Sequence, residues 1–297
     1  MKQSVRVPAF AKINLCLHVI GRRPDGYHEL RTIFQAISLH DTLELRRTKS
    51  SQVTLEIEGA ELSAGRDNLV HRAIEAIGGK LDFRGGIHAR LVKRIPIARG
   101  LGGGSSDAAA AMIAMLRLTG AKLPLSELME VASGLGADVP FFLFGGRALA
   151  VNRGDEIYPL PDAPRRTILV VSPKETGVST KEAYQWVSEE LTKRTEPPKI
   201  WGFCALCWSR QGAGVSNDFE GPVFRRHPRL GEIRAGLLQG GAADAALAGS
   251  GSAVFGVFRN PARARRTARK FPEDSVFAVQ TLSRKEYARA LGWRAGG

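Results

Sequence analysis

Hydrophobic and polar residues alternate along several stretches of the chain, and this alternation predicts β-strands. Residues 5–20 alternate and then become apolar, so we expect a strand with a break at Pro8, because proline cannot donate to a sheet ladder. A charged turn with Pro24 and Gly26 follows. Residues 41–58 alternate again, and this pattern predicts a hairpin.

Apolar residues at helical spacing lie between the predicted strands. Asp67 and Asn68 form a helix-start signal before an amphipathic stretch that reaches Ile77. An alanine-rich run to Leu118 predicts a second helix, for which we expect a serine cap. The other predicted helices cover residues 125–133, ending at Gly134, and 180–191.

The remaining segments complete an α+β pattern without a regular βαβ series. We expect strands at 87–95 and 167–171, and a strand or hairpin at 141–151 with Gly145 and Gly146 at its turn. Residues 160–166 contain two prolines and predict a domain junction. The expected domains are therefore residues 1–160 and 161–297.

Composition narrows the classes of protein and of partner. The chain has 297 residues, with 43 Lys and Arg against 29 Asp and Glu, a net charge of +14 that favours anionic partners. The apolar run 108–116 falls well short of the roughly 18 residues that a membrane span needs, and no signal peptide is visible. The three cysteines are typical of a reducing compartment. We expect a cytoplasmic protein that does not bind membranes.

The glycine-rich segment from Gly100 to Gly104 is the most informative part of the chain. Four of its five residues are glycine, and it leads into a predicted helix N-terminus, where free N–H groups favour an anion. No lysine follows as in a P-loop, and Ser105 occupies the sixth position of a dinucleotide fingerprint. The segment therefore predicts a different phosphate cradle; the alternative is a glycine-rich surface loop.

Residues Pro96 to Ser106 resemble the phosphate-binding motif of the GHMP kinases. Residues 8–15 resemble the opening strand of that family, and residues 248–256 resemble its third, glycine-rich motif. The resemblance covers about residues 8 to 258. It implies two α+β lobes with the active site in the cleft between them.

The same resemblance implies an ATP-dependent kinase that uses Mg²⁺. It assigns catalysis to Lys12 and Asp138, with Asp138 orienting the substrate hydroxyl and accepting its proton, and Lys12 stabilising charge. From the residues alone, a lysine and an aspartate so far apart in sequence form a surface ion pair more often than a catalytic one. The magnesium ligands stay open, with Ser105, Ser106 and Asp138 as candidates. The implied nucleotide-binding residues are Pro96, Ile97, Ala98, Arg99, Gly100, Leu101, Gly102, Gly103, Gly104, Ser105 and Ser106.

Three further blocks, residues 21–30, 135–140 and 217–220, resemble a family member that phosphorylates a cytidine diphosphate derivative of a sugar alcohol for isoprenoid synthesis. Tyr27 and His28 would hold the cytosine, and Tyr184 would complete an aromatic sandwich. Tyr184 could also be a partly buried helix aromatic. The other implied substrate-binding residues are Asn14, Thr180, Gly249, Ser250 and Gly251.

Two other functions are weighed against this one. Another GHMP kinase, of the homoserine or mevalonate type, would have no use for a cytosine site at Tyr27 and His28. A nucleic-acid-binding protein would explain the basic run 259–270, but a solvated helix face explains it as well, so we expect no nucleic-acid partner. Cys204 and Cys207 lack the second pair of a zinc site. We expect a monomer or a homodimer.

Overall fold

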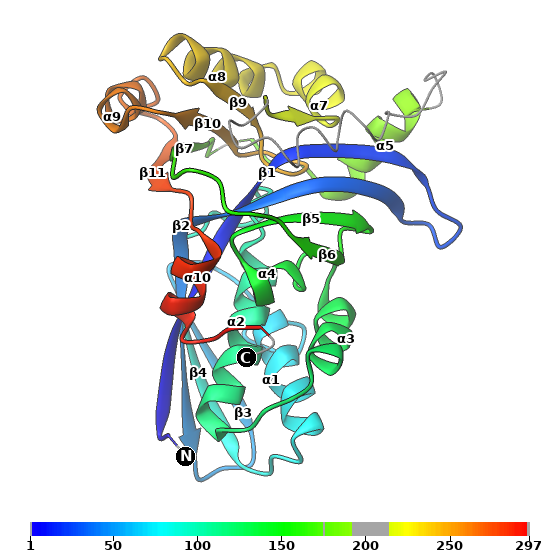
Figure 1. Ribbon diagram of the computed structural model, residues 1–297, viewed down its shortest axis with the longest axis vertical. Coiled ribbons are helices and arrows are strands. Elements are labelled where there is room, and N and C mark those ends of the chain that lie inside the picture. Colours follow the sequence, from blue (N-terminus) through cyan, green and yellow to red (C-terminus); the bar gives the residue numbers. More distant parts are fainter. Residues whose placement is uncertain (1, 175, 192–213, 296–297) are drawn as a thin grey trace.

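The fold is built on two β-sheets, each covered by helices (Figure 1). It is taken from a computed structural model that describes residues 2–174, 176–191 and 214–295. Among these residues, the larger sheet has seven strands: five in the order β3-β4-β2-β1-β8, with β5 paired to β2 and β6 paired to β5. Its strands are β1 (Ser4–Arg22), β2 (His28–Thr48), β3 (Val53–Glu58), β4 (Gly86–Val92), β5 (Arg147–Asn152), β6 (Glu156–Pro159) and β8 (Ser216–Asn217).

One layer of helices covers the larger sheet and encloses an apolar core with it. The central helix is apolar on all sides, and every residue from Ala108 to Leu116 is buried, which explains its many alanines. The helices around this core are α1 (Leu69–Lys80), α2 (Gly103–Thr119), α3 (Leu125–Leu135), α4 (Phe141–Phe144) and α10 (Arg284–Leu291).

The smaller sheet has four strands in the order β11-β7-β10-β9 within the described part of the chain. These strands are β7 (Thr167–Ser172), β9 (Asp244–Leu247), β10 (Val254–Phe258) and β11 (Ser275–Gln280). The helices packed with them are α5 (Thr180–Leu191), α7 (Glu220–Arg226), α8 (Pro228–Gln239) and α9 (Pro261–Ala268). The confirmed α+β class follows from this combination of mainly antiparallel sheets and separate helices.

The two longest strands, β1 and β2, pair along almost their whole length and reach from one helix layer to the other (Figure 1). Their pairing shifts register at three places, one of them between Phe10 and Lys12. Such bulges bend a strand and re-aim side chains, often beside active sites. One of these register shifts lies directly beside the charged residue Lys12.

Two strand predictions were wrong for reasons of pairing. Pro8 does not break β1, because β8 covers the other edge of β1 only at Cys16 and Leu17, so no partner needs the missing amide hydrogen. Residues 41–58 do not form a hairpin, since β4 lies between β2 and β3 and pairs with both.

Other predictions were wrong in detail. Residues 141–151 begin with the short helix α4, and the strand starts only after Gly145 and Gly146. Helix α2 is capped by Gly102 in the left-handed conformation, not by a serine side chain. Gly134 lies inside α3, which ends at Leu135 with Gly136 as its C-cap. Cys204 and Cys207 lie outside the described residues.

The end of the described chain returns to the first helix layer. Leu282, Tyr287 and Leu291 belong to the same core as α1 and α2, although they follow the second sheet in sequence. The domain boundary at 160/161 stays a prediction. Among the described helices, we find none with the length and hydrophobicity that a membrane crossing requires.

Candidate active site

A cleft of about 800 Å³ brings together residues from the larger sheet, from α5 and from turns next to both sheets. Its wall includes Lys12 and Asn14 from β1, Asp138 before α4, Tyr184 from α5 and Gly249 from the turn between β9 and β10. The sequence separates these positions widely, so only the folded chain creates the cleft. The other predicted residues in its lining are Tyr27, His28, Gly100, Gly102, Ser105, Thr180 and Ser250.

Lys12 and Asp138 form an ion pair in this cleft, with 3.4 Å between Nζ and Oδ2. The Lys12 side chain is only 5% exposed, whereas that of Asp138 is 33% exposed. A buried ammonium group is costly unless it is paired and hydrogen-bonded. The sequence-based alternative of a surface pair therefore does not describe Lys12, although Asp138 remains open to the cleft.

A chain of hydrogen bonds fixes the position of the Lys12 ammonium group. Lys12 Nζ donates to Asn14 Oδ1 at 2.9 Å, and Asn14 Nδ2 donates to Thr32 Oγ1 at 2.7 Å. Thr32 in turn donates to the carbonyl oxygen of Cys16. The ammonium group also lies 4.9 Å from the centre of the Phe34 ring, a cation–π distance. Asn14 thus orients Lys12, besides lining the cleft.

The glycine loop separates this cleft from a second cavity of about 350 Å³. Gly100 and Gly102 have φ angles of +77° and +70°, which explains why glycine occupies them. The loop leads into the N-terminus of α2, where unpaired N–H groups point outward. Gly100, Gly102 and Ser105 line both cavities, so one molecule could reach from the smaller to the larger.

Most of the predicted nucleotide-binding segment lines the smaller cavity. Residues 96–105 all contribute to its wall, but Ser106 does not. Ser106 is buried beneath the loop, and its hydroxyl has no hydrogen-bond partner among the described residues. Arg99 directs its guanidinium group to the second sheet, where it donates to Ser252 Oγ and to the carbonyl oxygen of Thr176.

Sequence reasoning missed a buried charge cluster beneath the glycine loop. Lys93 donates to Asp107 at 2.6 Å and makes a second ion pair with Asp41. Burial opposes the charge on Lys93, yet the two carboxyl groups raise its pKa. Burial raises the pKa of Asp107 to about 8, although Lys93 acts against this shift. The useful signal was a lysine next to an apolar strand, the same signal that singled out Lys12.

An aromatic cluster also lines the larger cleft. The His28 ring stacks on the Tyr184 ring with 4.7 Å between centroids and 25° between planes. His28 Nε2 lies 2.7 Å from Ser188 Oγ, and Phe219 packs edge-on against Tyr184. Burial, followed by the charge of Arg22, lowers the pKa of His28, which favours the neutral imidazole.

Tyr27 lies at the rim of the same end and is 56% exposed. The ring that stacks on Tyr184 in this structure is that of His28, not that of Tyr27. Thr180 Oγ1 lies 3.1 Å from Ser250 Oγ, so α5 meets the second glycine-rich turn there. Gly251 belongs to that turn but does not line the described cavities.

The charges of the large cleft suit an anionic ligand. Lys12, Arg22, Arg153 and Lys181 line it, against the single carboxylate of Asp138. No cluster of three or more His, Cys, Asp or Glu side chains able to hold a metal ion occurs within residues 2–174, 176–191 and 214–295. A divalent ion would therefore find only one carboxylate here and would depend on ligand phosphates and water.

Comparisons with known proteins agree with this geometry. Two family profiles match the chain, GHMP kinases N terminal domain over residues 68–146 and GHMP kinases C terminal over residues 200–275. A protein of Solibacter usitatus named 4-diphosphocytidyl-2-C-methyl-D-erythritol kinase is 46% identical over 96% of this chain and 90% of its own length. The chain belongs to the GHMP kinase family. It is therefore an ATP-dependent small-molecule kinase.

Solved structures place this GHMP kinase among the same proteins. The crystal structure of a 4-(cytidine 5'-diphospho)-2C-methyl-D-erythritol kinase superposes with a TM-score of 0.79 at 36% identity, covering 93% of this chain and 99% of the other. A homoserine kinase from Cytophaga hutchinsonii, with a TM-score of 0.70 at 18% identity, covers 95% of this GHMP kinase and 96% of its own chain. The latter likeness concerns the fold alone.

Proposed function

We propose that this GHMP kinase transfers the γ-phosphoryl group of ATP to the 2-hydroxyl of 4-diphosphocytidyl-2-C-methyl-D-erythritol, in the synthesis of isoprenoid precursors. One observation carries the proposal: the cleft that holds the Lys12–Asp138 ion pair also holds the His28–Tyr184 stack. A kinase for homoserine or mevalonate has no base to place there. The names of the relatives agree with this substrate.

ATP fits the smaller cavity, with its phosphates on the glycine loop. The N–H groups at the start of α2 and the helix dipole stabilise phosphate oxygens at Gly102 to Ser105. Because Gly100, Gly102 and Ser105 also face the large cleft, the γ-phosphoryl group would lie at the boundary between the two cavities. There it meets the ammonium group of Lys12.

The reaction forms a bond between the 2-hydroxyl oxygen and the γ-phosphorus, breaks the bond to the bridging oxygen, and releases ADP. Asp138 accepts the hydrogen bond of the 2-hydroxyl, keeps its oxygen in line and takes its proton late in the transfer. Lys12 donates to the transferring phosphoryl group, whose negative charge it stabilises. Asn14 keeps Lys12 in place through the 2.9 Å hydrogen bond.

Mg²⁺ fits this arrangement as an ion brought by ATP. It is a hard cation that prefers oxygen ligands and retains several waters, so one carboxylate and a hydroxyl are sufficient protein partners. Asp138 and Ser105 both line the large cleft and would hold the ion against the phosphates. Bound Mg²⁺ neutralises phosphate charge and orients the γ-phosphoryl group.

The cytidine end of the substrate would occupy the aromatic end of the cleft. Neutral His28 can hydrogen-bond the edge of the cytosine, and Tyr27 and Tyr184 offer aromatic faces. The positive charges of Arg22 and Lys181 would attract the diphosphate. We further infer that the net charge of +14 serves these anionic small molecules, with no nucleic acid involved, in a cytoplasmic monomer or homodimer.

A coupled ADP-release assay tests this function with ATP, Mg²⁺ and 4-diphosphocytidyl-2-C-methyl-D-erythritol, with mevalonate and homoserine as alternative acceptors. We expect turnover with the cytidyl substrate only. Asp138→Asn and Lys12→Met should lower kcat by about 10²- to 10⁴-fold with an unchanged melting temperature. Turnover of mevalonate or homoserine in place of the cytidyl substrate would contradict the proposal.

A further inference from the structure

Tyr27 occupies the turn between β1 and β2, at the far end of the two longest strands. Its ring is 56% exposed, although it lines the rim of the large cleft. A side chain on an exposed turn samples several rotamers, and ordering it upon binding lowers affinity. A second group that holds the ring before the ligand arrives would remove that cost.

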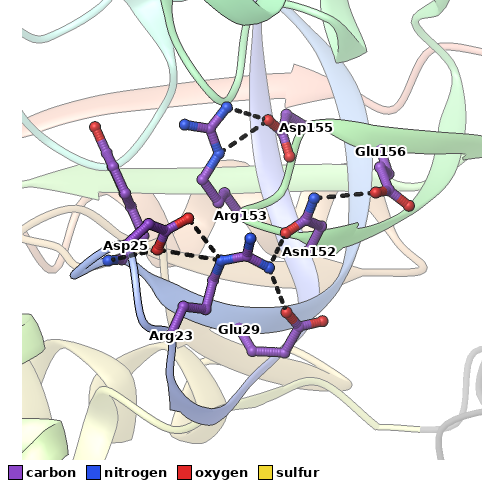
Figure 2. Close-up of polar contacts among 8 residues, drawn as sticks. Arg23, Asp25, Glu29, Asn152, Arg153, Asp155 and Glu156 are labelled. Carbon is purple, nitrogen blue, oxygen red and sulfur yellow. Dashed lines mark hydrogen bonds and ion pairs between the residues drawn. The ribbon is translucent and has the colours of Figure 1, made fainter.

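The backbone of this turn is fixed by Arg23. The Arg23 amide donates to the carbonyl oxygen of Tyr27 at 2.8 Å, and the Tyr27 amide donates to Asp25 Oδ1 at 3.1 Å. The Arg23 guanidinium group donates to Asp25 on one side and to Glu29 and Asn152 on the other (Figure 2). The hairpin turn is thereby tied to the turn between β5 and β6.

The turn between β5 and β6 presents a second arginine to Tyr27. The Arg153 guanidinium carbon lies 5.0 Å from the centre of the Tyr27 ring. Two of its nitrogens donate to the same Asp155 oxygen, at 3.1 and 2.5 Å (Figure 2). Asp155 is itself only 8% exposed, so it is a firm anchor for the guanidinium group. Gly154, with φ of +94°, allows the sharp turn between the two residues.

We propose that Arg153 is a positioning residue for pyrimidine recognition: it holds one face of the Tyr27 ring at the rim of the cleft and leaves the other face for the base of the substrate. This inference rests on the proposed function and adds to it a residue that acts through Tyr27. A guanidinium group is well suited to the task, because it stacks flat on an aromatic ring while its edge nitrogens remain bonded to Asp155.

The test measures kinase activity and, separately, binding of cytidine and cytidine 5'-diphosphate by calorimetry. Arg153→Gln should raise the KM for the cytidyl substrate and both Kd values about tenfold. We expect kcat and the KM for ATP to stay within about twofold, since Lys12, Asp138 and the glycine loop are untouched. Arg153→Lys should restore part of the affinity. Arg90→Gln, which removes an exposed arginine bonded to Glu58 at 2.6 Å, is the matched control and should change none of these values.

A double-mutant cycle with Tyr27→Ala separates positioning from direct contact with the diphosphate. If Arg153 acts through Tyr27, Arg153→Gln should cause no further loss in the Tyr27→Ala background. A further loss there that is larger for cytidine 5'-diphosphate than for cytidine would overturn the inference in favour of a phosphate contact. An unchanged KM in Arg153→Gln would also overturn it and leave the proposed function intact. If the wild-type enzyme binds neither cytidine nor cytidine 5'-diphosphate, both the role of Arg153 and the proposed function are wrong.

Discussion

Gly100 and Ala248 lie so close that a Cβ atom added to Gly100 would be 1.8 Å from the Ala248 carbonyl oxygen. This contact joins the first glycine-rich loop to the second one. A Cβ atom added to Gly249 would likewise lie 3.1 Å from the Gly100 carbonyl oxygen. Both partners are backbone atoms, which cannot rotate away. The two motifs that the sequence analysis singled out separately are therefore two sides of one contact.

Gly100→Ala should lower both stability and activity. The substitution adds the steric conflict with Ala248 to the roughly 1–2 kcal/mol cost of a left-handed alanine. We expect the free energy of unfolding to fall by more than about 2 kcal/mol and ATP turnover to fall at least tenfold. Urea unfolding and the ADP-release assay measure the two effects.

Gly78→Ala is the control for this substitution. Gly78 lies in α1, and a Cβ atom there would meet nothing within 4 Å, so the exchange should stabilise the protein by roughly 0.5–1 kcal/mol. If Gly100→Ala and Gly78→Ala changed the free energy of unfolding and the ATP turnover equally, the Gly100–Ala248 contact would not constrain the loop.

The sequence predicted local features better than strand neighbours. Helix α1 was found because Asn68 caps it, with its side chain accepting from the Val70 amide at 2.9 Å. The glycine loop was found because four glycines in five residues, just before a helix, indicate a backbone that approaches an anion closely. The alternation over residues 41–58 shows which side chains face the core, but it contains no information on the strand that pairs beside β2. The insertion of β4 depends on contacts between distant segments.

The candidate site follows the same rule. Lys12 and the loop could be predicted because a charge in an apolar run and a run of glycines are unusual within their own segments, whereas His28 was implied by the family resemblance. Arg153 could not, since Tyr27 reaches it only after β5 pairs with β2. The site residues themselves stay predictions until variants are measured.

His28 should make cytidine binding depend on pH in the acidic range only. Burial lowers its pKa below the ordinary 6.5, so the imidazole is neutral at pH 7 and suited to the cytosine edge. We expect the Kd for cytidine 5'-diphosphate to be constant between about pH 7 and 8 and to rise as the pH falls below 6.5. Calorimetry over this range measures it.

The same shift predicts a trend in stability. Below pH 6.5 the unfolded chain binds a proton at His28 more readily than the folded chain, so the free energy of unfolding should decrease as the pH falls through that value. His28→Gln removes the titrating group and should flatten both profiles. A rise in affinity on acidification would mean that the protonated imidazole is the binding form.

Asp107 should produce the opposite trend. With a pKa of about 8 in the folded chain against an ordinary 3.8, its carboxyl group holds a proton that the unfolded chain has lost. The contribution of Asp107 to the free energy of unfolding therefore declines as the pH rises from about 4 to about 8, by roughly 1 kcal/mol per pH unit. Asp107→Asn mimics the protonated acid, so its stability relative to wild type should increase from about pH 5 to pH 8, measured by urea unfolding.

Asp41 is the matched comparison within the same cluster. It accepts from the Ile95 amide at 2.8 Å and pairs with Lys93, so Asp41→Asn leaves a buried lysine without its second carboxylate. We expect a loss of about 3–5 kcal/mol near pH 7 and a lower pKa for Asp107, because Asp41 is one of the groups that raise it. Parallel unfolding profiles of wild type and Asp107→Asn would contradict the assignment of the raised pKa to Asp107.

Tyr287 anchors the end of the described chain to the first core and, through α4, to the glycine loop. Its hydroxyl donates to the Phe142 carbonyl oxygen at 2.7 Å, and a Cβ atom at Gly102 would lie 2.9 Å from the Phe142 ring. Tyr287→Phe leaves a buried carbonyl without this donor and should cost about 1–2 kcal/mol of stability. Because α4 stays packed, kcat should remain within about twofold.

Tyr287→Ala removes the ring that fills the space beside Gly145, and should cost about 3–5 kcal/mol. Tyr158→Phe, at a residue that is 52% exposed, provides the control and should leave the melting temperature unchanged. Hydrogen exchange of the α2 amides in Tyr287→Ala tests the domain boundary. If these amides stay protected, only the second sheet and its helices unfold, so α10 belongs with that sheet and the boundary at 160/161 holds. If α2 loses protection as well, the last helix is part of the first core, and the boundary must be drawn so that residues 282–291 return to it.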